Sequence, residues 1–553
     1  MAHIEQSGQS EQSEQSEQSE HGLGSSPRNP TDNLHLQVWL AVVILLIALS
    51  ARLLPGPRTI DDSFITYRYT RNILAGNGFV YNPGERVLGT TTPLYTVLLV
   101  MLGFITGGTQ APFPLLSLLV NALCDALTCL LLLRLGRKLE SPLAGIGCAL
   151  LWAVAPYSVT FAIGGLETSL YVLLLTSTVS AYIDRRYPLA AFLGALSLLT
   201  RPDALILLGP MALDRLISLF ISRRREATFA RRIRSAAVDL VIFLAPVLPW
   251  VIFSVAYFGS PLPHSIAAKS LAYRLPGDAA LIRLLQHYAT PFLENLTFGT
   301  PAIGVGAVLY MFLYFVGARH AFQAQKHLWF WLAYPWLYFI TFAVANPLIF
   351  RWYLTPPLPA YFLAILVGVE HILGQVASGL RIKEQSVART ALISIFVVLA
   401  PLGLTLRGWT LHPDHAQGRP APDMAFIKLE LLYRQAADYL APEMSVSSSP
   451  PLLAAGDVGV LGFYTGARIL DTVGLNSPVS TRYYPLDPAY YVINYAIPPD
   501  LIVDQHPDYV VILEVYGRLG LLQDPRFQAA YQLRQKIPTD MYGSNGLLIF
   551  AKR

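Results

Sequence analysis

Two adjacent acids, Asp61 and Asp62, follow the first apolar segment of the chain. Charged groups beside a lipid bilayer are costly and commonly mark a functional site. A partly desolvated carboxylate there can act as a general base that takes a proton from a hydroxyl. The pair could instead hold a divalent metal ion or orient a ligand. The non-functional alternative is a helix start with an acidic first turn, because Thr59 and Ile60 precede a helical-looking run, 63–75.

Two arginines, Arg68 and Arg71, follow the acids at helical spacing, so one helix face would carry both signs. Intrahelical ion pairs would explain this spacing, and each would contribute only about 0.2–0.5 kcal/mol. The functional alternative is a clamp on a phosphate group, which suits the fork of a guanidinium. The spacing alone leaves both interpretations open.

Further polar residues stand where later apolar segments end, or in the long loop after the seventh of them. Anchoring at the membrane interface, or arginine–carboxylate pairs that close helix ends, would explain them without function. They become candidates for ligand binding because the predicted topology places them on the same side as the acids. These residues are Glu167, Arg201, Asp203, His264, Lys269 and Arg351.

The composition is that of a membrane protein. Of 553 residues, 54% are hydrophobic and only 14% are charged, whereas soluble domains have about 25% charged residues. The net charge of +5 does not indicate nucleic-acid binding, because the basic residues fall in short clusters between apolar runs, as in cytoplasmic loops. The three cysteines, Cys124, Cys129 and Cys148, lie inside apolar segments, which predicts packing rather than disulfides or metal binding.

Eleven apolar segments are predicted to span the membrane. The run 93–106 is apolar but has only 14 residues, and a spanning helix needs about 20. We therefore expect it to be an interfacial or re-entrant helix. The predicted spans are 36–54, 113–135, 142–162, 166–183, 188–199, 204–221, 236–257, 298–316, 328–345, 353–373 and 390–406.

The basic loops predict the orientation. With a cytoplasmic N-terminus and a non-spanning 93–106 helix, every basic cluster falls inside, as the positive-inside rule requires. The first outer loop, 55–112, then lies outside with both acids. If 93–106 spanned, the strongest cluster, SRRREATFARRIR at 222–234, would face outside. We therefore predict a transmembrane domain over 35–409 in the plasma membrane, with its ionisable residues gathered at span ends.

Both ends of the chain differ from this domain. Residues 1–34 repeat Glu, Gln and Ser and have few apolar side chains, which predicts a disordered cytoplasmic tail rather than a signal peptide. From 410 to 553 we predict a small extracytoplasmic α/β domain, with a helix over 424–440 and β-rich runs at 451–465, 467–473, 508–515 and 546–553. Within it Asp457 and Asp471 could shape a ligand site, or could serve turn chemistry beside glycine.

The run DDSFITYRYTRNILAGNGFVYNPGERVLGTTTPL at 61–94 resembles the first-loop motif of polytopic C-type glycosyltransferases (GT-C), in particular the mycobacterial terminal arabinofuranosyltransferase group. The resemblance continues in GLETSLY at 165–171, TRPDALIL at 200–207, LPHSIAAKS at 262–270 and AGDVGVLGFYTGARILDTVGLNSP at 455–478. It covers most of the chain. Two positions depart from the family: Asp203, where glutamate is more frequent, and His264, where asparagine is frequent.

The resemblance implies an inverting transfer from a polyprenyl-phosphate sugar to an extracytoplasmic glycan, lipid or protein. It implies that a first-loop aspartate is the base, here Asp61 with Asp62 in support. It also implies phosphate contacts from Arg68, Arg71 and Lys269. The change at His264 suggests a different pocket, and neither the sugar nor the acceptor carries over.

Two other classes of function compete with this hypothesis. A transporter or flippase for a lipid-linked glycan should show internal repeats, broken helices and ionisable residues near the middle of the bilayer. A non-catalytic scaffold that binds glycan should tolerate the replacement of Asp61 or Asp62 by asparagine.

Overall fold

The computed structural model describes residues 30–221, 226–292, 299–383, 386–412, 419–422, 425–446 and 450–553. Contacts divide the chain into two units, residues 1–43 and residues 44–553. Of the predicted tail, 1–34, residues 1–29 lie outside the described residues. Helix α1, Pro30–Leu53, begins in the first unit and ends in the second. Apart from the first part of α1, the features below belong to the second unit.

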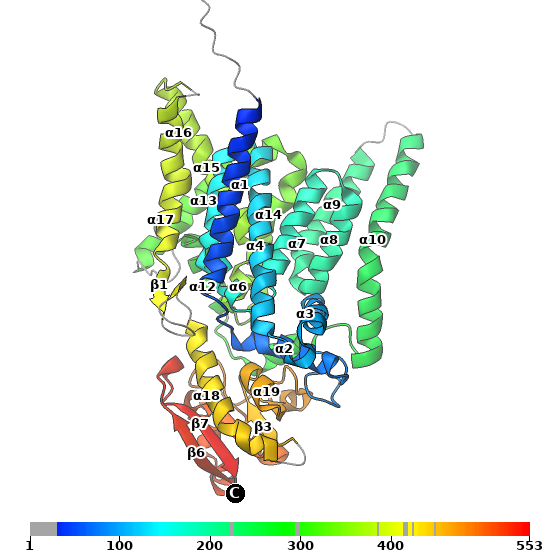
Figure 1. Ribbon diagram of the computed structural model, residues 1–553, viewed down its shortest axis with the longest axis vertical. Coiled ribbons are helices and arrows are strands. Elements are labelled where there is room, and N and C mark those ends of the chain that lie inside the picture. The colour runs from blue at the N-terminus through cyan, green and yellow to red at the C-terminus, as the bar shows by residue number, and fades with distance from the viewer. Residues whose placement is uncertain are drawn as a thin grey trace, which may run out of the picture. The chain divides into compact units, whose positions relative to one another are not determined.

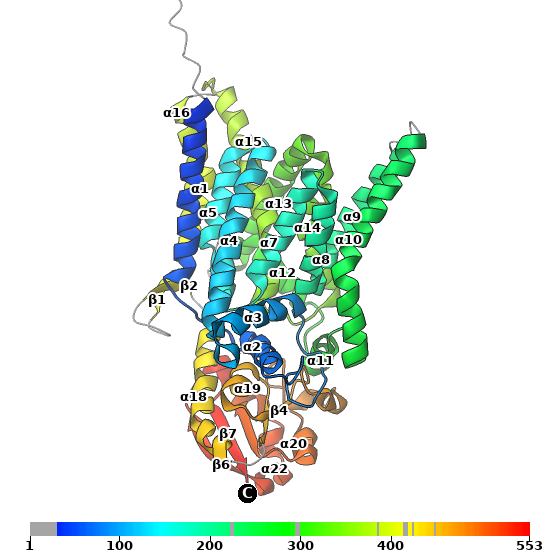
Figure 2. The same ribbon diagram turned by 45° about the vertical axis from the view of Figure 1, so that its right-hand side comes forward.

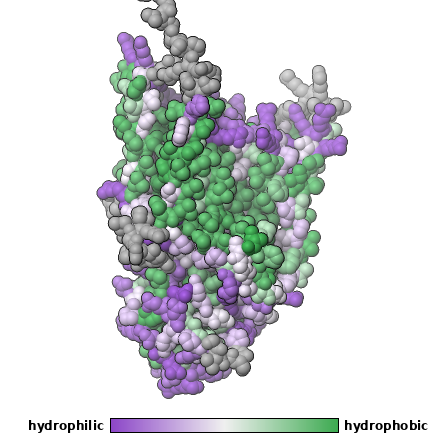
Figure 3. Space-filling model, in the orientation of Figure 1, coloured by the Kyte–Doolittle hydropathy of each residue, from purple (hydrophilic) through white to green (hydrophobic). Residues whose placement is uncertain are grey.

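Apolar helices dominate this structure, and apolar side chains cover the helical part of the surface (Figure 3). Among the described residues, eight helical segments are long and apolar enough to cross a membrane. Helices α7 (Thr168–Ile183) and α8 (Tyr187–Thr200) are apolar but shorter, and α9 (Leu205–Ile221) has 17 residues. The polytopic helical fold is confirmed, while the count of eleven spans stays a prediction. The eight segments are Leu34–Leu53, Phe113–Lys138 (α4), Pro142–Ile163 (α5 and α6), Ala230–Phe258 (in α10), Ile303–Ala324 (in α13), Lys326–Ala345 (with α14), Leu358–Gly379 (α15) and Val387–Leu406 (α16 and α17).

Two helices of the first loop lie across the direction of the others. These are α2, Asp61–Leu74, and α3, Pro93–Thr106, and both run transverse to α4 at the end of the bundle nearest the C-terminal strands (Figures 1 and 2). This arrangement agrees with the prediction that 93–106 does not span. Two further short helices, α11 (His264–Ala272) and α12 (Ala279–Ala289), fill the segment between α10 and α13.

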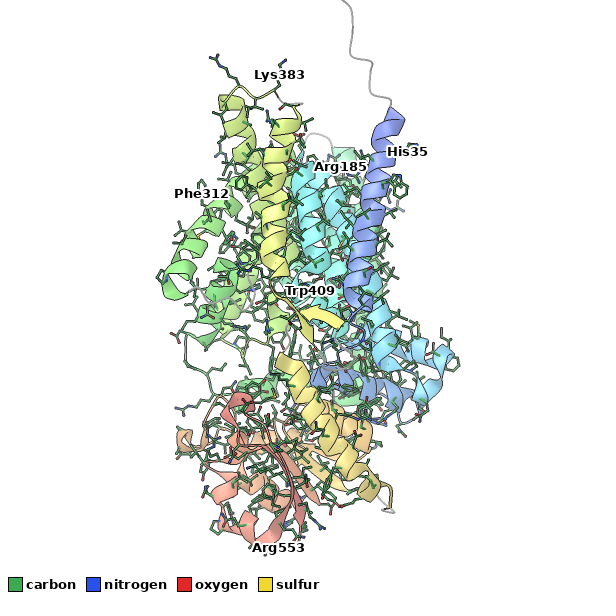
Figure 4. All side chains as sticks on the ribbon, turned by 60° about the vertical axis from the view of Figure 1, so that its left-hand side comes forward. His35, Arg185, Phe312, Lys383, Trp409 and Arg553 are labelled. Atoms are coloured by element: carbon green, nitrogen blue, oxygen red, sulfur yellow. The ribbon has the colours of Figure 1, made fainter. Side chains whose placement is uncertain are left out.

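The basic loops gather at the other end of the bundle. Arg134 and Lys138 of α4 both pair with Asp184, which follows α7. Arg185 and Lys383 lie at that end, whereas Arg553 lies at the end formed by the C-terminal strands (Figure 4). The clustering agrees with the predicted loop pattern, and the assignment of either end to a side of the membrane stays a prediction.

One charged pair contradicts the prediction that ionisable residues gather at span ends. Asp125, in the middle of α4, forms a fully buried ion pair of 2.8 Å with Arg52. Its carboxylate also accepts hydrogen bonds from Trp152 and Ser169. A buried charge that is paired and hydrogen-bonded in this way is a fixed part of the packing. The sequence shows each residue separately and does not reveal the pairing.

The C-terminal part is an α/β fold, as predicted. Its five-stranded sheet has the order β4-β3-β5-β7-β6, in which β3 pairs parallel with β4 and β5, while β7 pairs antiparallel with β5 and β6. A short antiparallel pair, β1 with β2, precedes it. The strands are β1 Trp409–His412, β2 Arg419–Pro422, β3 Leu452–Ala455, β4 Arg468–Asp471, β5 Tyr509–Leu513, β6 Tyr531–Ile537 and β7 Leu547–Lys552; the helices are α18 Ala425–Val446, α19 Gly459–Thr465, α20 Pro499–Gln505, α21 Glu514–Gly517 and α22 Pro525–Ala530 (Figure 1).

Two local predictions in this domain were wrong. The run 451–465 is strand only at β3, and its second half is helix α19. The apolar residues of α19 suited a strand, and the group that caps the helix lies far away in sequence. Strand β6 was missed because it is mostly exposed and its sequence, YQLRQKI, lacks the apolar run of an inner strand.

Candidate functional site

The acid Asp61 joins the first loop to the C-terminal domain. Its carboxylate accepts backbone hydrogen bonds from Gly459 at 2.9 Å and Val460 at 2.8 Å, so it caps the N-terminus of α19. A side chain at Gly459 would collide with the Asp61 carbonyl oxygen. We call this contact, made by Asp61, Arg68, Gly459, Val460 and Gly462, the α2–α19 joint.

Arg68 belongs to the same joint. Its guanidinium is buried and donates to the carbonyl oxygens of Tyr81, Gly462 and Ala467 and to Oδ1 of Asn82, at 2.5–3.1 Å. The donors of its guanidinium group are therefore engaged within the protein and not directed at a ligand. Neither alternative from the sequence describes Arg68, because it pairs with no acid of its own helix and does not line the cavities described below.

Arg71 also lies away from the cavities. Its guanidinium sits 4.3 Å from the centre of the Phe463 ring, in a cation–π contact. Phe463 belongs to α19, so Arg71 adds a packing contact between α2 and α19 beside the joint. The prediction of a phosphate clamp on α2 has no support in this geometry, because the helix turns both arginines toward α19.

Asp62 differs from its neighbour in exposure and in hydrogen bonding. It is half-buried, and its carboxylate accepts no hydrogen bond from the part of the chain that the structure describes. Burial raises the pKa of Asp62, and the nearby Lys269 ammonium opposes that rise. Asp62 lines both of the cavities that meet at the start of α2, a position it shares with Trp352.

The first cavity, about 300 Å³, lies between the first loop and the ends of the helices. Lys269 of α11 reaches it, 4.7 Å from the Phe350 ring. Although burial alone lowers the pKa of Lys269, the Tyr353 hydroxyl and the Asp62 carboxylate raise it above its ordinary value. Lys269 therefore carries its charge in this cavity.

A second cation on the same wall is already neutralised. Arg201 is held by Glu167 at 3.2 Å and by both carboxylate oxygens of Asp203, at 3.0 and 3.1 Å. The Tyr338 hydroxyl donates to Asp203 at 3.1 Å. The three charged residues all line the first cavity. The arginine–carboxylate pairing that the sequence suggested is therefore present, and the paired residues also line the cavity.

The second cavity, about 400 Å³, lies between the first loop and the carboxyl ends of the parallel strands. Asp61 and Asp62 lie on one wall, and Asp457, which follows β3, joins them. Burial raises the pKa of Asp457 to about 6, and Tyr433 donates to it at 2.8 Å. Burial and the Asp457 charge likewise raise the pKa of Asp61. Tyr273, Arg283, Arg351, Tyr495, Tyr516 and Tyr542 line the rest of this cavity.

His264 and Asp471 lie elsewhere. His264 begins α11, and its backbone N–H donates to the carbonyl of Leu88 at 2.8 Å. Burial lowers its pKa, so the ring is neutral. Asp471 is fully buried, and its carboxylate accepts the backbone N–H groups of Val473, Gly474 and Asn476. The turn interpretation therefore describes Asp471.

The described residues do not fit a bound metal ion. Among them, no group of three His, Cys, Asp or Glu side chains is placed to hold one. Both oxygens of Asp61 already accept hydrogen bonds from α19. Of the two acids, only Asp62 therefore keeps carboxylate oxygens that accept no hydrogen bond from the described residues.

The sequence reasoning missed Arg283 and the tyrosines of the second cavity. Arg283 lies in a helix that looked like ordinary loop sequence between two spans. The tyrosines come from separate elements: Tyr273 follows α11, Tyr495 lies in a loop of the C-terminal domain, Tyr516 lies in α21, and Tyr542 lies in a short 3₁₀ turn. The tyrosine-rich run 490–495 was the one available signal, because aromatic residues clustered in a loop commonly contact ligands.

Comparison with known proteins agrees with the resemblance drawn from residues 61–94. The chain is 31% identical over 258 residues to a terminal β-(1→2)-arabinofuranosyltransferase of Mycobacterium tuberculosis, which covers 43% of this chain and 39% of that protein. It is 28% identical over 295 residues to the enzyme of the same name from Corynebacterium glutamicum, covering 48% and 39%. The chain thus matches about two fifths of the length of these relatives. A family model described as a domain of unknown function (DUF8728) matches residues 426–550.

Two solved structures share the fold. The Archaeoglobus fulgidus oligosaccharyltransferase superposes with a TM-score of 0.53 at 12% identity, over 92% of this chain and 72% of that chain. ArnT of Cupriavidus metallidurans, bound to undecaprenyl phosphate, gives 0.51 at 15% identity, over 95% and 98%. At such identities the likeness shows the fold, and it confirms the expected GT-C-like architecture.

Proposed function

We propose that this chain is a membrane glycosyltransferase. It transfers a sugar from a polyprenyl-phosphate donor to an extracytoplasmic glycan, lipid or protein, with inversion at the anomeric carbon. The observation that carries this proposal is the place of Asp62 on the wall common to two cavities. The named arabinofuranosyltransferase relatives support the reaction class, and ArnT, with its bound undecaprenyl phosphate, supports the type of donor.

The first cavity receives the sugar phosphate. Lys269 is charged there, and it stabilises the negative charge that grows on the phosphate as its bond to the sugar breaks. Arg201 is already balanced by Glu167 and Asp203, so it shapes the wall rather than adding net charge. The phosphate is a good leaving group, and this side of the reaction needs no general acid.

The second cavity receives the acceptor. Its hydroxyl approaches the anomeric carbon from the side opposite the phosphate, beside Asp62, which lines both cavities. The new bond forms as the old one breaks, and the configuration inverts. The acceptor hydroxyl gives its proton to a carboxylate at this meeting point.

Asp62 is the better placed of the two acids for that role. A general base needs a lone pair free to meet the proton, and no described residue donates a hydrogen bond to the Asp62 carboxylate. The resemblance pointed to Asp61, and that assignment stays a prediction. Asp61 has both oxygens engaged by the α2–α19 joint, so we assign it the positioning of α19 against the cavity.

The test is turnover by the purified full-length protein with a panel of polyprenyl-phosphate sugars and candidate acceptors. Release of polyprenyl phosphate by the wild type, together with its loss in Asp62→Asn, would support the proposal. If no donor is consumed and no lipid phosphate is released with any pair, the enzyme hypothesis fails. A scaffold would bind glycan equally well with either acid replaced.

The orientation has its own test. The loop charges predict that the end carrying Lys383 is cytoplasmic and that the C-terminal domain is outside. Reporter fusions after Gly379 and after Arg553 should therefore report opposite sides of the membrane. The same side for both would remove the predicted topology.

A further inference from the structure

Two arginines share the lining of the second cavity with the acids. Arg283 comes from α12, and Arg351 begins the turn that carries Trp352; both line the cavity. Arg351 lies 5.8 Å from the Tyr157 ring, and that ring contacts His287 at 4.7 Å between centres. Arg283 and Arg351 both interact electrostatically with Tyr157 and His287, so the two guanidinium groups belong to one cluster.

The net charge of this cluster comes from the arginines. Burial lowers the pKa of His287 to about 3, and the neighbouring Arg283 and Arg351 act in the same direction. His287 is therefore neutral. Arg283 is half-buried and forms no ion pair with any residue in the described ranges. A cation held partly out of water without a counter-ion is costly, so such a position is suited to an anionic ligand.

The part of the cavity lining that comes from the C-terminal domain indicates what kind of ligand enters. Gly456 and Asp457 follow β3, Val473 follows β4, and Tyr516 follows β5, so the carboxyl ends of all three parallel strands face the cavity. Strand β3 lies between β4 and β5, and open α/β sheets bind ligands where their strand order reverses. The occupant therefore touches the C-terminal domain, which suits the acceptor rather than the lipid part of the donor.

We infer that the acceptor carries a compact anionic group, a phosphate or a carboxylate, that Arg283 and Arg351 bind while its hydroxyl meets Asp62. This inference rests on the proposed function and adds the chemical class of its acceptor. Guanidinium groups bind both anions through paired N–H donors. The anion and the reacting hydroxyl are then held in one cavity by separate groups, which fixes the direction from which the hydroxyl approaches.

The test uses the full-length protein and three matched acceptor oligosaccharides: one with a phosphate monoester, one with a uronic acid, and one neutral. Arg283→Gln should raise KM for a charged acceptor about tenfold, with KM for the donor and for the neutral acceptor unchanged. Arg283→Lys keeps the charge and should recover part of the loss. Arg274→Gln is the matched control, because Arg274 is exposed and lines neither cavity.

Each alternative result overturns the inference. Equal KM values for all three acceptors in the wild type would mean that no anion is recognised. A higher KM for the donor in Arg283→Gln would assign the arginines to the donor phosphate. A second readout needs no turnover: methyl phosphate should raise the melting temperature of the wild type and not of Arg283→Gln. If methyl phosphate binds in this way but no sugar is transferred, the proposed function fails while the anion site stands.

Discussion

The α2–α19 joint and the wall of the two cavities each contain an aspartate and a cation, with opposite outcomes. In the joint, the Asp61 carboxylate accepts hydrogen bonds from backbone N–H groups of α19, and the Arg68 guanidinium donates to backbone carbonyl oxygens. On the cavity wall, Asp62 and Lys269 keep free capacity toward open space. The difference teaches that a charged residue beside a membrane is a candidate for chemistry only when its polar atoms are not already hydrogen-bonded within the protein.

Replacing the cavity acid should have the largest effect. Asp62→Asn keeps the size of the side chain and removes its basicity. We expect turnover to fall by at least about a hundredfold, which is the usual contribution of a positioned base. The melting temperature should stay close to that of the wild type, because no described residue bonds to this carboxylate. Steady-state kinetics and a melting curve on the same preparation check both halves.

Its counterpart in the joint, Asp61→Asn, is the control. It should lower the melting temperature as well as turnover, because one acceptor for the α19 N–H groups becomes a donor. If Asp61→Asn instead abolishes turnover at an unchanged melting temperature, while Asp62→Asn remains active, the roles of the two acids are the reverse of those proposed.

The two arginines of α2 extend the comparison to stability. Arg68→Met should destabilise the fold by about 2–3 kcal/mol, because it leaves buried carbonyl oxygens without their donors. Arg71→Met should cost less, about 1 kcal/mol, because its half-buried cation–π contact lies between an exposed contact of about 0.5 kcal/mol and a desolvated one of about 2 kcal/mol. Thermal unfolding in detergent measures both. Equal losses would show that the joint does not depend on Arg68.

Replacing Lys269 tests whether the first cavity binds the donor, with a smaller expected effect. Lys269→Ala should raise KM for the donor about tenfold, since a hydrogen bond to a charged group contributes about 1.5–3 kcal/mol and a factor of ten is about 1.4 kcal/mol. KM for the acceptor should change little. A selective rise in KM for the acceptor would mean that the first cavity binds the acceptor and the second binds the donor.

The smallest effect is a pH dependence of stability. Burial raises the pKa of Asp457 to about 6 in the folded protein, against about 3.9 in an unfolded chain. The folded state thus binds this proton more tightly, so the stabilisation is complete below about pH 4 and is lost as the pH rises through about 6. Between pH 5 and pH 7 this group should account for about 1 kcal/mol.

The control for that dependence is Asp457→Asn, which should flatten it. Asp61 and Asp471 also have raised pKa values and act in the same direction, so only the difference between wild type and variant isolates Asp457. Unfolding curves across this pH range measure it, and identical slopes for the two proteins would contradict the burial of an ionisable Asp457 in the cavity.

Most elements of the fold were predictable, because they depend on local patterns. Apolar runs located the helices, the short run 93–106 indicated a helix that does not span, and basic clusters indicated which loops share one end. The parallel strands β3, β4 and β5 were each recognisable from short apolar runs. Strand β6 and helix α19 were not, since the first lies at an exposed edge and the second is capped from another domain.

The candidate site was predicted only in part. Seven of the ten residues chosen from the sequence line one of the two cavities, while Arg68, Arg71 and His264 do not. The seven share a predicted place on the outer side of the membrane, in loops or at the ends of spans, and topology alone brings such positions together. Arg68 and Arg71 also met that criterion, so position could not separate them from Lys269.

The sequence by itself determined the class of this protein: a chain of apolar helices, an acidic first loop and an α/β C-terminal domain, because each of these follows from local hydrophobicity and charge. Only the tertiary structure decided which charged atoms are used. The contact of Asp61 with Gly459 joins residues 398 positions apart, and no periodicity or spacing encodes such a partner. Hydrogen-bonding capacity is consumed through space, so whether a carboxylate serves structure or chemistry becomes visible only when its neighbours are known.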